Sequence, residues 1–206
     1  MNAGLICAGA FVVAFFAGAV PFGVLVSRAF YGTDIRSSGS GNIGAANALR
    51  TLGKRGAVAV LVLDALKGFA PVLAAGAVGG LTAAASAALG AVIGHCWSPF
   101  LGFKGGKGVA TLLGAVIALW WPSGIAFAIV WIAAVLACGY ASVGSMLAAL
   151  AMAPVLWFGL GPVGLAYGAV SALVILYRHR ENLDRLRQGT ENRLTLLKTP
   201  RTHERE

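Results

Sequence analysis

The feature that most constrains this chain is a long stretch without charge: from Val109 to Tyr177 the sequence contains no Asp, Glu, Lys or Arg. A water-facing surface of that length would need charged side chains, because soluble domains carry roughly 25% of them. Over the whole chain of 206 residues only 11% are charged, whereas 58% are hydrophobic. The solvent that faces most of this protein is therefore expected to be lipid.

Breaks in the apolar pattern divide the chain into spans. A bilayer core about 30 Å thick takes about 20 helical residues, and Gly or Pro residues interrupt the apolar stretches at 79–80, 121–124, 139–142 and 159–162. We predict an all-α, polytopic membrane protein of one domain over residues 1–206, with seven transmembrane helices. The predicted spans are 5–26, 57–78, 81–97, 109–120, 124–139, 145–158 and 163–177, before a polar tail over 178–206. A five-span arrangement with two re-entrant segments is the alternative.

The basic residues indicate the orientation of these spans. If the polar stretch 27–56 is placed inside, all 16 Lys and Arg residues lie on the inside or in the inner half of a helix. Cytoplasmic loops carry such an excess, so we expect the N-terminus outside and the C-terminus in the cytoplasm. The same rule accounts for most of the net charge of +9. Residues 1–25 lack Lys and Arg, which favours a retained first span over a cleavable signal peptide.

The cysteines do not indicate a metal site or a disulfide. Cys7, Cys96 and Cys138 are far apart, lie in apolar surroundings and form no CxxC pair. Zinc sites and redox motifs depend on close spacing. We expect all three to pack between helices and expect no bound metal.

The first of four polar segments predicted on the inner side runs from Ser37 to Arg50. Its glycines allow several backbone N–H groups to point at one anion, as in the nests that bind phosphate. Serines and asparagines add donors, and Arg50 offers a bidentate fork. We expect a phosphate site rather than a flexible linker, with these candidate residues: Ser40, Gly41, Asn42, Gly44, Asn47 and Arg50.

The second segment runs from Gly94 to Thr111 and holds Gly-Gly-Lys-Gly just before a predicted helix. A helix N-terminus with nearby lysines is a ready anion site. It is not a Walker A motif, because Gly108 follows Lys107 where Ser or Thr is needed, so an NTPase is disfavoured. A basic loop on anionic lipid headgroups is the alternative, and His95 is expected to hold the loop to the helix ends. The candidate site residues are Lys104, Gly105, Gly106, Lys107 and Gly108.

The third and fourth segments carry weaker signals. The third, 139–145, contains Ser142 and by itself indicates a turn with a Ser cap. The fourth, 178–193, contains His179 and Asn182, which are three residues apart and share a face of a continuing helix. A basic segment that ends the last span is the alternative interpretation of the fourth.

Together these motifs resemble those of the bacterial acyl-phosphate:glycerol-3-phosphate acyltransferases, the PlsY-type integral membrane acyltransferases. The first segment is similar to that family's Ser-Gly-Asn-Ile-Gly-Ala-Thr-Asn loop ending in Arg, and the second to its Gly-His…Phe-x-Gly-Gly-Lys-Gly loop. The Ser turn and the His-Arg-Glu-Asn segment match as well, so the resemblance runs from residue 3 to residue 195. One departure is Ala46, where the family usually has Thr; the lost hydroxyl is one that Ser40 can replace.

The resemblance implies acyl transfer from acyl phosphate to the sn-1 hydroxyl of glycerol 3-phosphate, which gives 1-acyl-glycerol 3-phosphate and inorganic phosphate. It implies no cofactor, a site that faces the cytoplasm at the bacterial inner membrane, and a soluble acyl-phosphate synthase as functional partner; nucleic acid is not expected to bind. The donor phosphate is assigned to Ser40, Gly41, Asn42, Lys104, Gly105, Gly106 and Lys107, and glycerol 3-phosphate to Arg50, Ser142, His179 and Asn182.

No Ser-His-Asp arrangement is visible in the sequence, so direct attack without an acyl-enzyme is expected. A substrate phosphate, whose second pKa is about 6, is the first choice of proton acceptor, and His179 as general base is the second. Asp64 and Lys67 lie three apart on one helix face at membrane depth. They are expected either to support the loops as an ion pair or to contact substrate.

Two rival functions each fit part of the sequence. His179 and Asp184 fit the His-x-x-x-x-Asp spacing of an unrelated acyltransferase family, but residues five apart do not share a helix face and that family's other blocks are missing. A transporter for an organic phosphate anion explains seven spans and a basic site. It predicts polar groups or broken helices near the midplane, and the apolar outer halves argue against it.

Overall fold

The computed structural model describes residues 2–194, and every regular element within them is a helix. The predicted all-α membrane fold is confirmed. Residues 195–206, the end of the predicted tail, lie outside the described residues. The stretches long and apolar enough to cross a membrane are Ala3–Tyr31, Gly53–Leu101, Trp121–Cys138 and Ala141–Arg178.

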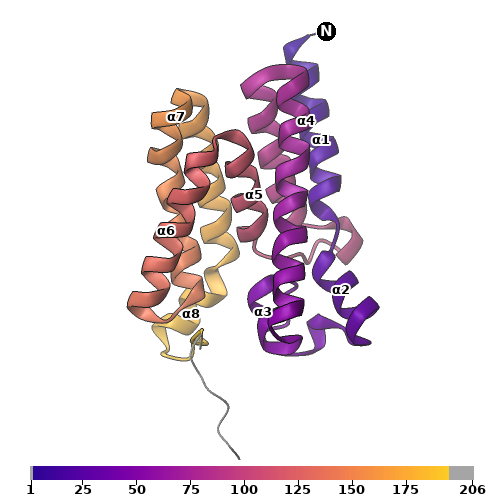
Figure 1. Cartoon of the computed structure of the whole chain (residues 1–206), viewed down its shortest axis with the longest axis vertical. Helices are drawn as coiled ribbons and strands as arrows, with labels where there is room; N and C mark the ends of the chain where they lie inside the picture. The colour runs from indigo at the N-terminus through magenta and orange to yellow at the C-terminus, as the bar shows by residue number, and fades with distance from the viewer. Residues whose placement is uncertain (1, 195–206) are drawn as a thin grey trace, which may run out of the picture.

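The helices follow one another along the chain with short connections (Figure 1). They are α1 (Ala3–Ala19), α2 (Phe22–Tyr31), the 3₁₀ helix η1 (Ile35–Ser37), α3 (Ala45–Thr51), α4 (Gly53–Cys96), the 3₁₀ helix η2 (Pro99–Leu101), α5 (Val109–Leu119), α6 (Trp121–Cys138), α7 (Ala141–Arg178) and α8 (Arg180–Arg187).

Two of these helices are hairpins. α4 turns back at Gly80, with φ 69°, and α7 at Gly161, with φ 62°. Glycine adopts this left-handed conformation without a Cβ clash. When the two arms of α4 and of α7 are taken separately, they form with α1, α5 and α6 seven apolar helical segments in residues 2–194. The α5 segment, with 11 residues, is only about 16 Å long at 1.5 Å per residue.

Several predicted boundaries differ from the structure. The predicted first span, 5–26, is divided, because α1 ends at Ala19 and α2 begins after Pro21. Residues 121–124, expected to form a break, are the first turn of α6, and the break is the extended residue Trp120. Pro122 lies in that first turn. An N–H group there has no partner within the helix, so its absence in Pro costs no hydrogen bond. The predicted span 145–158 likewise begins four residues early, at Ala141.

The outward faces of the helices are apolar, and their contacts with one another are close. Ile129, Leu136 and Leu173 are 61%, 75% and 66% exposed, as lipid-facing side chains are. Inside, a Cβ added to Gly90 would lie 2.3 Å from the carbonyl oxygen of Phe11. Small residues allow membrane helices to approach at backbone distance. The chain is therefore a multi-pass membrane protein held together by small-residue contacts.

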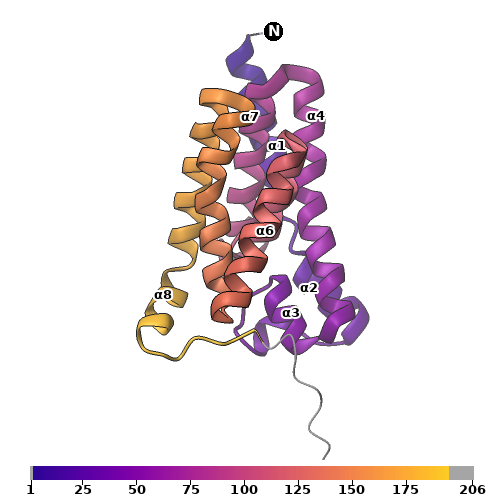
Figure 2. The ribbon, with the colours of Figure 1, turned by 60° about the vertical axis from the view of Figure 1, so that its left-hand side comes forward.

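The polar segments gather at one end of this bundle. Figure 1 shows α2, α3 and α8 at the end opposite the N-terminus. In Figure 2 the segment after α8 runs beneath α6 toward α3, and the backbone N–H of Leu194 donates to the carbonyl of Gly139, 2.7 Å away, at the α6–α7 connection. This end carries the segments that the sequence singled out.

Candidate active site

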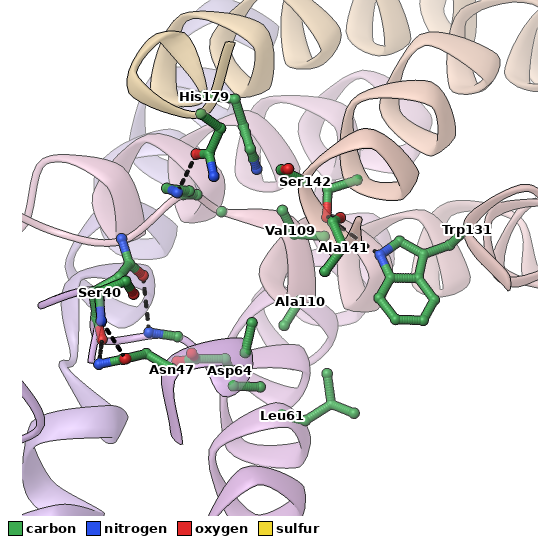
Figure 3. Close-up of a pocket in the computed structure, with 18 of the residues that line it drawn as sticks. Ser40, Asn47, Leu61, Asp64, Val109, Ala110, Trp131, Ala141, Ser142 and His179 are labelled. Atoms are coloured by element: carbon green, nitrogen blue, oxygen red, sulfur yellow. Dashed lines mark hydrogen bonds between the residues drawn. The ribbon is translucent and has the colours of Figure 1, made fainter. Parts of the chain in front are cut away.

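A cavity of about 350 Å³ lies where the four polar segments meet (Figure 3). Ser40 and Asn47 approach it from one side and Trp131 from the other, with Val109 and Ala110 between them. The predicted site residues that line it are Ser40, Asn42, Gly44, Asn47, Arg50, Lys107, Gly108, Ser142, His179 and Asn182. Four predicted residues do not line it: Gly41, Lys104, Gly105 and Gly106.

Residues 37–47, here named the asparagine loop, are organised by one side chain. Asn47 is buried, and its Nδ2 lies 2.9, 3.1 and 2.8 Å from the carbonyl oxygens of Ile35, Ser38 and Asn42. Its Oδ1 accepts from the backbone N–H of Ser40 at 2.8 Å. An amide has two donors and one acceptor oxygen, so Asn47 is already fully used. It therefore shapes the loop from within.

Other side chains of the same region remain available to a ligand. Ser40 and Arg50 are exposed and line the cavity. The Oδ1 of Asn42 accepts from the backbone N–H of Gly44 at 3.0 Å, and Asn42 lines the cavity. Ala46 is also part of the lining. A Thr at that position would therefore add a hydroxyl to the cavity wall.

Residues 102–108, here named the glycine–lysine loop, are held from outside. The N–H of Gly106 donates to the carbonyl of His95 at 3.0 Å, and Arg178 donates to the carbonyls of Gly106 and Gly105 at 3.0 and 2.9 Å. A Cβ on Gly106 would lie 2.1 Å from Nε2 of His95. These glycines pack closely against the end of α4, and neither lines the cavity. Their assignment to the donor phosphate stays a prediction. Lys104 is exposed outside the cavity.

Lys107 is the residue of this loop that reaches the cavity. Its Nζ donates to Oδ1 of Asn182. Burial, together with the nearby charge of Arg185, lowers the pKa of Lys107 to about 8. The loop ends at Gly108, which caps α5 without a side-chain hydrogen bond. The first N–H groups of an uncapped helix are open to an anion, and Val109 and Ala110 line the cavity.

On the side of the cavity formed by α7 and α8, the carboxylate of Glu191 accepts hydrogen bonds from several donors. Glu191 accepts hydrogen bonds from Ser142 at 2.8 Å, Asn182 at 2.6 Å and Arg185 at 2.7 Å. Burial alone raises the pKa of Glu191, but these three hydrogen bonds outweigh it and the pKa is lowered. Glu191 is thus ionised and orders Asn182, which in turn accepts from Lys107. Neither Glu191 nor Arg185 was predicted; their only signal was their place in the fourth polar segment.

His179 is buried where α7 ends. Its Nδ1 lies 2.8 Å from the carbonyl oxygen of Ile175, an arrangement that fixes the neutral tautomer with Nδ1–H as donor and Nε2 as acceptor. Burial and the charge of Lys107 lower the pKa of His179 to about 4. The imidazole is therefore neutral at pH 7.

The wall formed by α4, α5 and α6 is apolar except for Asp64 and His95 of α4. Its large apolar side chains are Leu61, Leu113, Phe127, Trp131 and Ile132. The indole N–H of Trp131 donates to Ser145 at 3.2 Å. Sites with one apolar side and a few convergent polar groups suit a ligand that is itself divided in this way. The geometry fits a molecule with an anionic head and an apolar tail.

Fold and cavity together define an integral membrane protein with an anion pocket at one end of a helical bundle. Among residues 2–194, no group of three His, Cys, Asp or Glu side chains comes together to hold a metal ion. The sequence model of the family described as glycerol-3-phosphate acyltransferase matches residues 8–189. The chain belongs to this family.

Individual relatives agree with that membership. A glycerol-3-phosphate acyltransferase of Rhodopseudomonas palustris (strain BisB5) is 44% identical over 185 residues, 90% of this chain and 94% of the relative. That of Jannaschia sp. (strain CCS1) is 45% identical over 184 residues, 89% of this chain and 90% of the relative.

Solved structures agree as well. The crystal structure of PlsY (YgiH), an integral membrane glycerol 3-phosphate acyltransferase, in its glycerol 3-phosphate form has a TM-score of 0.86 at 39% identity, covering 92% of this chain and 96% of that one. Its lysophosphatidic acid form has a TM-score of 0.84 at 37% identity, covering 91% and 95%.

Proposed function

We propose that this protein transfers a fatty acyl group from acyl phosphate to the sn-1 hydroxyl of glycerol 3-phosphate. The products are 1-acyl-glycerol 3-phosphate and inorganic phosphate, in the first step of phospholipid synthesis. One observation carries the proposal: a single cavity joins phosphate-type donors, including Lys107 and Arg50, to an apolar wall that includes Phe127. Acyl phosphate has both parts, and glycerol 3-phosphate needs only the polar one.

The donor phosphate is assigned to the head of the cavity. The uncapped N-terminus of α5 and Lys107 supply N–H groups and positive charge on one side. Ser40 and Asn42 add donors from the asparagine loop. Glycerol 3-phosphate is assigned to Arg50, Ser142 and Asn182, which line the same space. Arg50 suits this role because its fork matches two phosphate oxygens at once.

The acyl chain is assigned to the apolar wall. Leu61 on α4 and Ile132 on α6 line the cavity and are also 41% and 51% exposed on the lipid-facing surface. A chain placed between them passes directly from the bilayer to the head of the cavity. The donor can therefore enter from the membrane while glycerol 3-phosphate enters from water.

The reaction itself needs a hydroxyl, an acyl carbon and a place for one proton. The sn-1 oxygen attacks the acyl carbon, the bond from that carbon to the phosphate oxygen breaks, and the hydroxyl proton passes to phosphate. Phosphate has a second pKa of about 6, whereas the pKa of His179 is about 4. Phosphate is the stronger base of the two, which favours the substrate-assisted route. Nε2 of His179 then orients the hydroxyl by accepting its hydrogen bond.

Much of the catalysis follows from placement. Two bound phosphates bring the hydroxyl to the acyl carbon and convert a bimolecular step into an intramolecular one. Lys107 and the α5 N-terminus stabilise the charge on the departing phosphate. Membership of the acyltransferase family favours this reaction over the transporter alternative, and a soluble acyl-phosphate synthase is the class of partner that must supply the donor.

The orientation follows from charge. Among the described residues, most Lys and Arg side chains lie in α2–α3, the first turn of α4, the glycine–lysine loop, the end of α7 and α8, at the end opposite the N-terminus. Lys67 lies further along α4, and Arg193 follows α8. The positive-inside rule places that end in the cytoplasm, so the protein is assigned to the bacterial inner membrane with its site facing inward. In a cysteine-free background, Thr190→Cys should react with an impermeant maleimide only in inside-out vesicles and Asn2→Cys only in right-side-out cells; the opposite pattern would overturn this orientation.

The function is tested by donor choice. Purified protein in detergent or lipid is given glycerol 3-phosphate with either palmitoyl phosphate or palmitoyl-CoA, and phosphate and lysophosphatidic acid are measured together. Equal amounts of both products, formed only from palmitoyl phosphate, are expected. Equal activity with palmitoyl-CoA would contradict the donor assignment, and no product from either donor would direct attention to transport of glycerol 3-phosphate in liposomes.

A further inference from the structure

Three ionisable side chains of α4 lie buried beneath both loops. Asp64, Lys67 and His95 are 1%, 6% and 3% exposed. Nζ of Lys67 lies 2.7 Å from Oδ1 of Asp64, and Nδ1 of His95 lies 3.7 Å from the same oxygen. Charged side chains within a membrane are costly and are retained for a purpose. Asp64 and His95 also contribute to the lining of the cavity, but both carboxylate oxygens of Asp64 are buried.

One side of this cluster supports the asparagine loop. Lys67 donates to the carbonyl of Val20 at 2.7 Å, one of the carbonyls freed where α1 ends and α2 begins. α2 in turn seats the loop: Oγ of Ser27 accepts from the N–H of Ile35 at 3.2 Å, and a Cβ on Gly23 would lie 1.8 Å from the carbonyl oxygen of Ile43. Lys67 thus fixes the start of the helix on which the asparagine loop rests.

The other side supports the glycine–lysine loop. The carbonyl of His95 accepts from the N–H of Gly106 at 3.0 Å. Its ring occupies the space where a side chain of Gly106 would be, with Nε2 2.1 Å from the position of such a Cβ. The orientation of the His95 ring therefore determines how closely the glycine–lysine loop, which carries Lys107, packs against α4. Asp64 is the buried anion beside that ring.

We propose that Asp64, Lys67 and His95 are positioning residues that set the two phosphate-binding loops at a fixed distance from each other. The inference rests on the proposed acyl transfer, for which both loops must hold substrate phosphate at once. None of the three touches the reacting atoms. They act through Lys67 on the asparagine loop and through His95 on the glycine–lysine loop.

Stability alone does not require these charges. Replacing both members of a buried ion pair by apolar residues of similar volume is often neutral or stabilising, whereas removal of one partner is strongly destabilising. A purely structural pair is therefore replaceable by a matched apolar pair without loss of function. A positioning pair is not, because an apolar side chain at position 67 cannot donate to the carbonyl of Val20.

The experiment compares single and double replacements in the full-length protein. Asp64→Leu and Lys67→Met are made separately and together, and the thermal midpoint, kcat and KM for glycerol 3-phosphate are measured with palmitoyl phosphate as donor. The matched control is Asp184→Leu with Arg187→Met, a second pair at i and i+3 whose side chains are 61% and 78% exposed. The control pair should change neither stability nor kinetics.

We expect each single variant to lower the thermal midpoint and the double variant to recover it. The double variant should still raise KM for glycerol 3-phosphate by on the order of tenfold to a hundredfold, as small misplacements of binding groups do. A double variant with both the midpoint and the kinetics of the wild type would overturn the proposal, because the pair would then be structural only.

A second variant decides the matter if the double variant does not fold. His95→Asn keeps a polar group near Asp64 but removes the ring edge that lies against Gly106. A raised KM at an unchanged midpoint supports positioning, and wild-type kinetics contradict it. If the wild type itself shows no acyl transfer, the proposed function fails separately. The thermal shift that glycerol 3-phosphate causes in wild type and variants then still reports the positioning of the loops.

Discussion

The asparagine loop and the glycine–lysine loop face each other across one cavity but are built on opposite plans. The asparagine loop is organised from within, by Asn47, whose amide bonds to four backbone groups between residues 35 and 42. The glycine–lysine loop is held from outside, by His95 before it and by Arg178, more than 70 residues further along.

Because the two loops are held differently, a glycine does not have the same role in each. In the glycine–lysine loop, Gly105 and Gly106 lack side chains because His95 lies where those side chains would be. The N–H of Gly106 and the carbonyls of both glycines are already bonded within the protein, so we assign phosphate binding to Lys107 and the start of α5. A run of Gly next to Lys thus predicts a phosphate site without showing which of its residues line the cavity.

The largest effect should separate the two lysines of the glycine–lysine loop. Lys107 lines the cavity and Lys104 is exposed outside it. Lys107→Ala should lower kcat/KM on the order of 10²- to 10³-fold, as loss of one preorganised donor does, and Lys104→Ala by less than about threefold. Steady-state phosphate release measures both. Equal losses in the two variants would show that the sequence prediction for Lys104 was right and the cavity assignment incomplete.

The next effect should separate the two asparagines of the asparagine loop. Asn47→Ala removes the side-chain donor to three carbonyls. The carbonyl of Ile35 is buried, and an unpaired buried carbonyl costs about 1–3 kcal/mol, so this variant should lower both the thermal midpoint and activity. Asn42→Ala loses one bond within a turn and should affect KM with little change in the midpoint. Thermal unfolding and kinetics on the same preparations make the comparison. A stable, active Asn47→Ala protein would contradict the internal organisation of this loop.

A smaller effect tests the external support of the glycine–lysine loop. Arg178 donates to two carbonyls at once and its guanidinium lies 5.4 Å from the ring centre of Trp97. Lys cannot reproduce a bidentate, stacked contact, so Arg178→Lys should lower kcat/KM by on the order of tenfold. Arg180→Lys, at an exposed position two residues away, is the control. Identical kinetics for the two variants would mean that Arg178 supplies charge only.

The smallest effect is a pH dependence. The pKa of Lys107 is lowered to about 8, so the free protein loses this charge as the pH rises through that value. kcat/KM for palmitoyl phosphate should therefore be level near pH 7 and fall to about half at the pKa of Lys107. Lys107→Arg keeps its charge and should shift this decline upward. The same decline in both proteins would assign it to another group.

The membrane fold and most of the cavity follow from patterns that are local in the chain. The sequence shows the uncharged stretch from Val109 to Tyr177 and the breaks at Gly80 and Gly161. It also shows the resemblance of the loops to a known family. What was missed depends on contacts between distant residues. Glu191 lies in the site only because the chain after α8 returns to Ser142. No local sequence pattern indicates that return.

The departures at helix ends have a similar cause. Trp121 to Gly124 looked like a break because Pro and Gly favour turns, yet Pro is also tolerated in the first turn of a helix. Which of the two applies depends on how α5 and α6 meet at Trp120. The sequence likewise left open whether Asp64 and Lys67 contact substrate, because their burial depends on the packing of α4.

Segments distant in the chain are proposed to form one site for the phosphate of glycerol 3-phosphate. Calorimetric titration of glycerol 3-phosphate into the purified wild type and into Arg50→Ala and Asn182→Ala, whose residues come from different segments, tests this proposal. One site is expected in the wild type, with an affinity weakened by about tenfold or more in each variant, as loss of a charge-assisted phosphate contact implies. Wild-type affinity in either variant would contradict it.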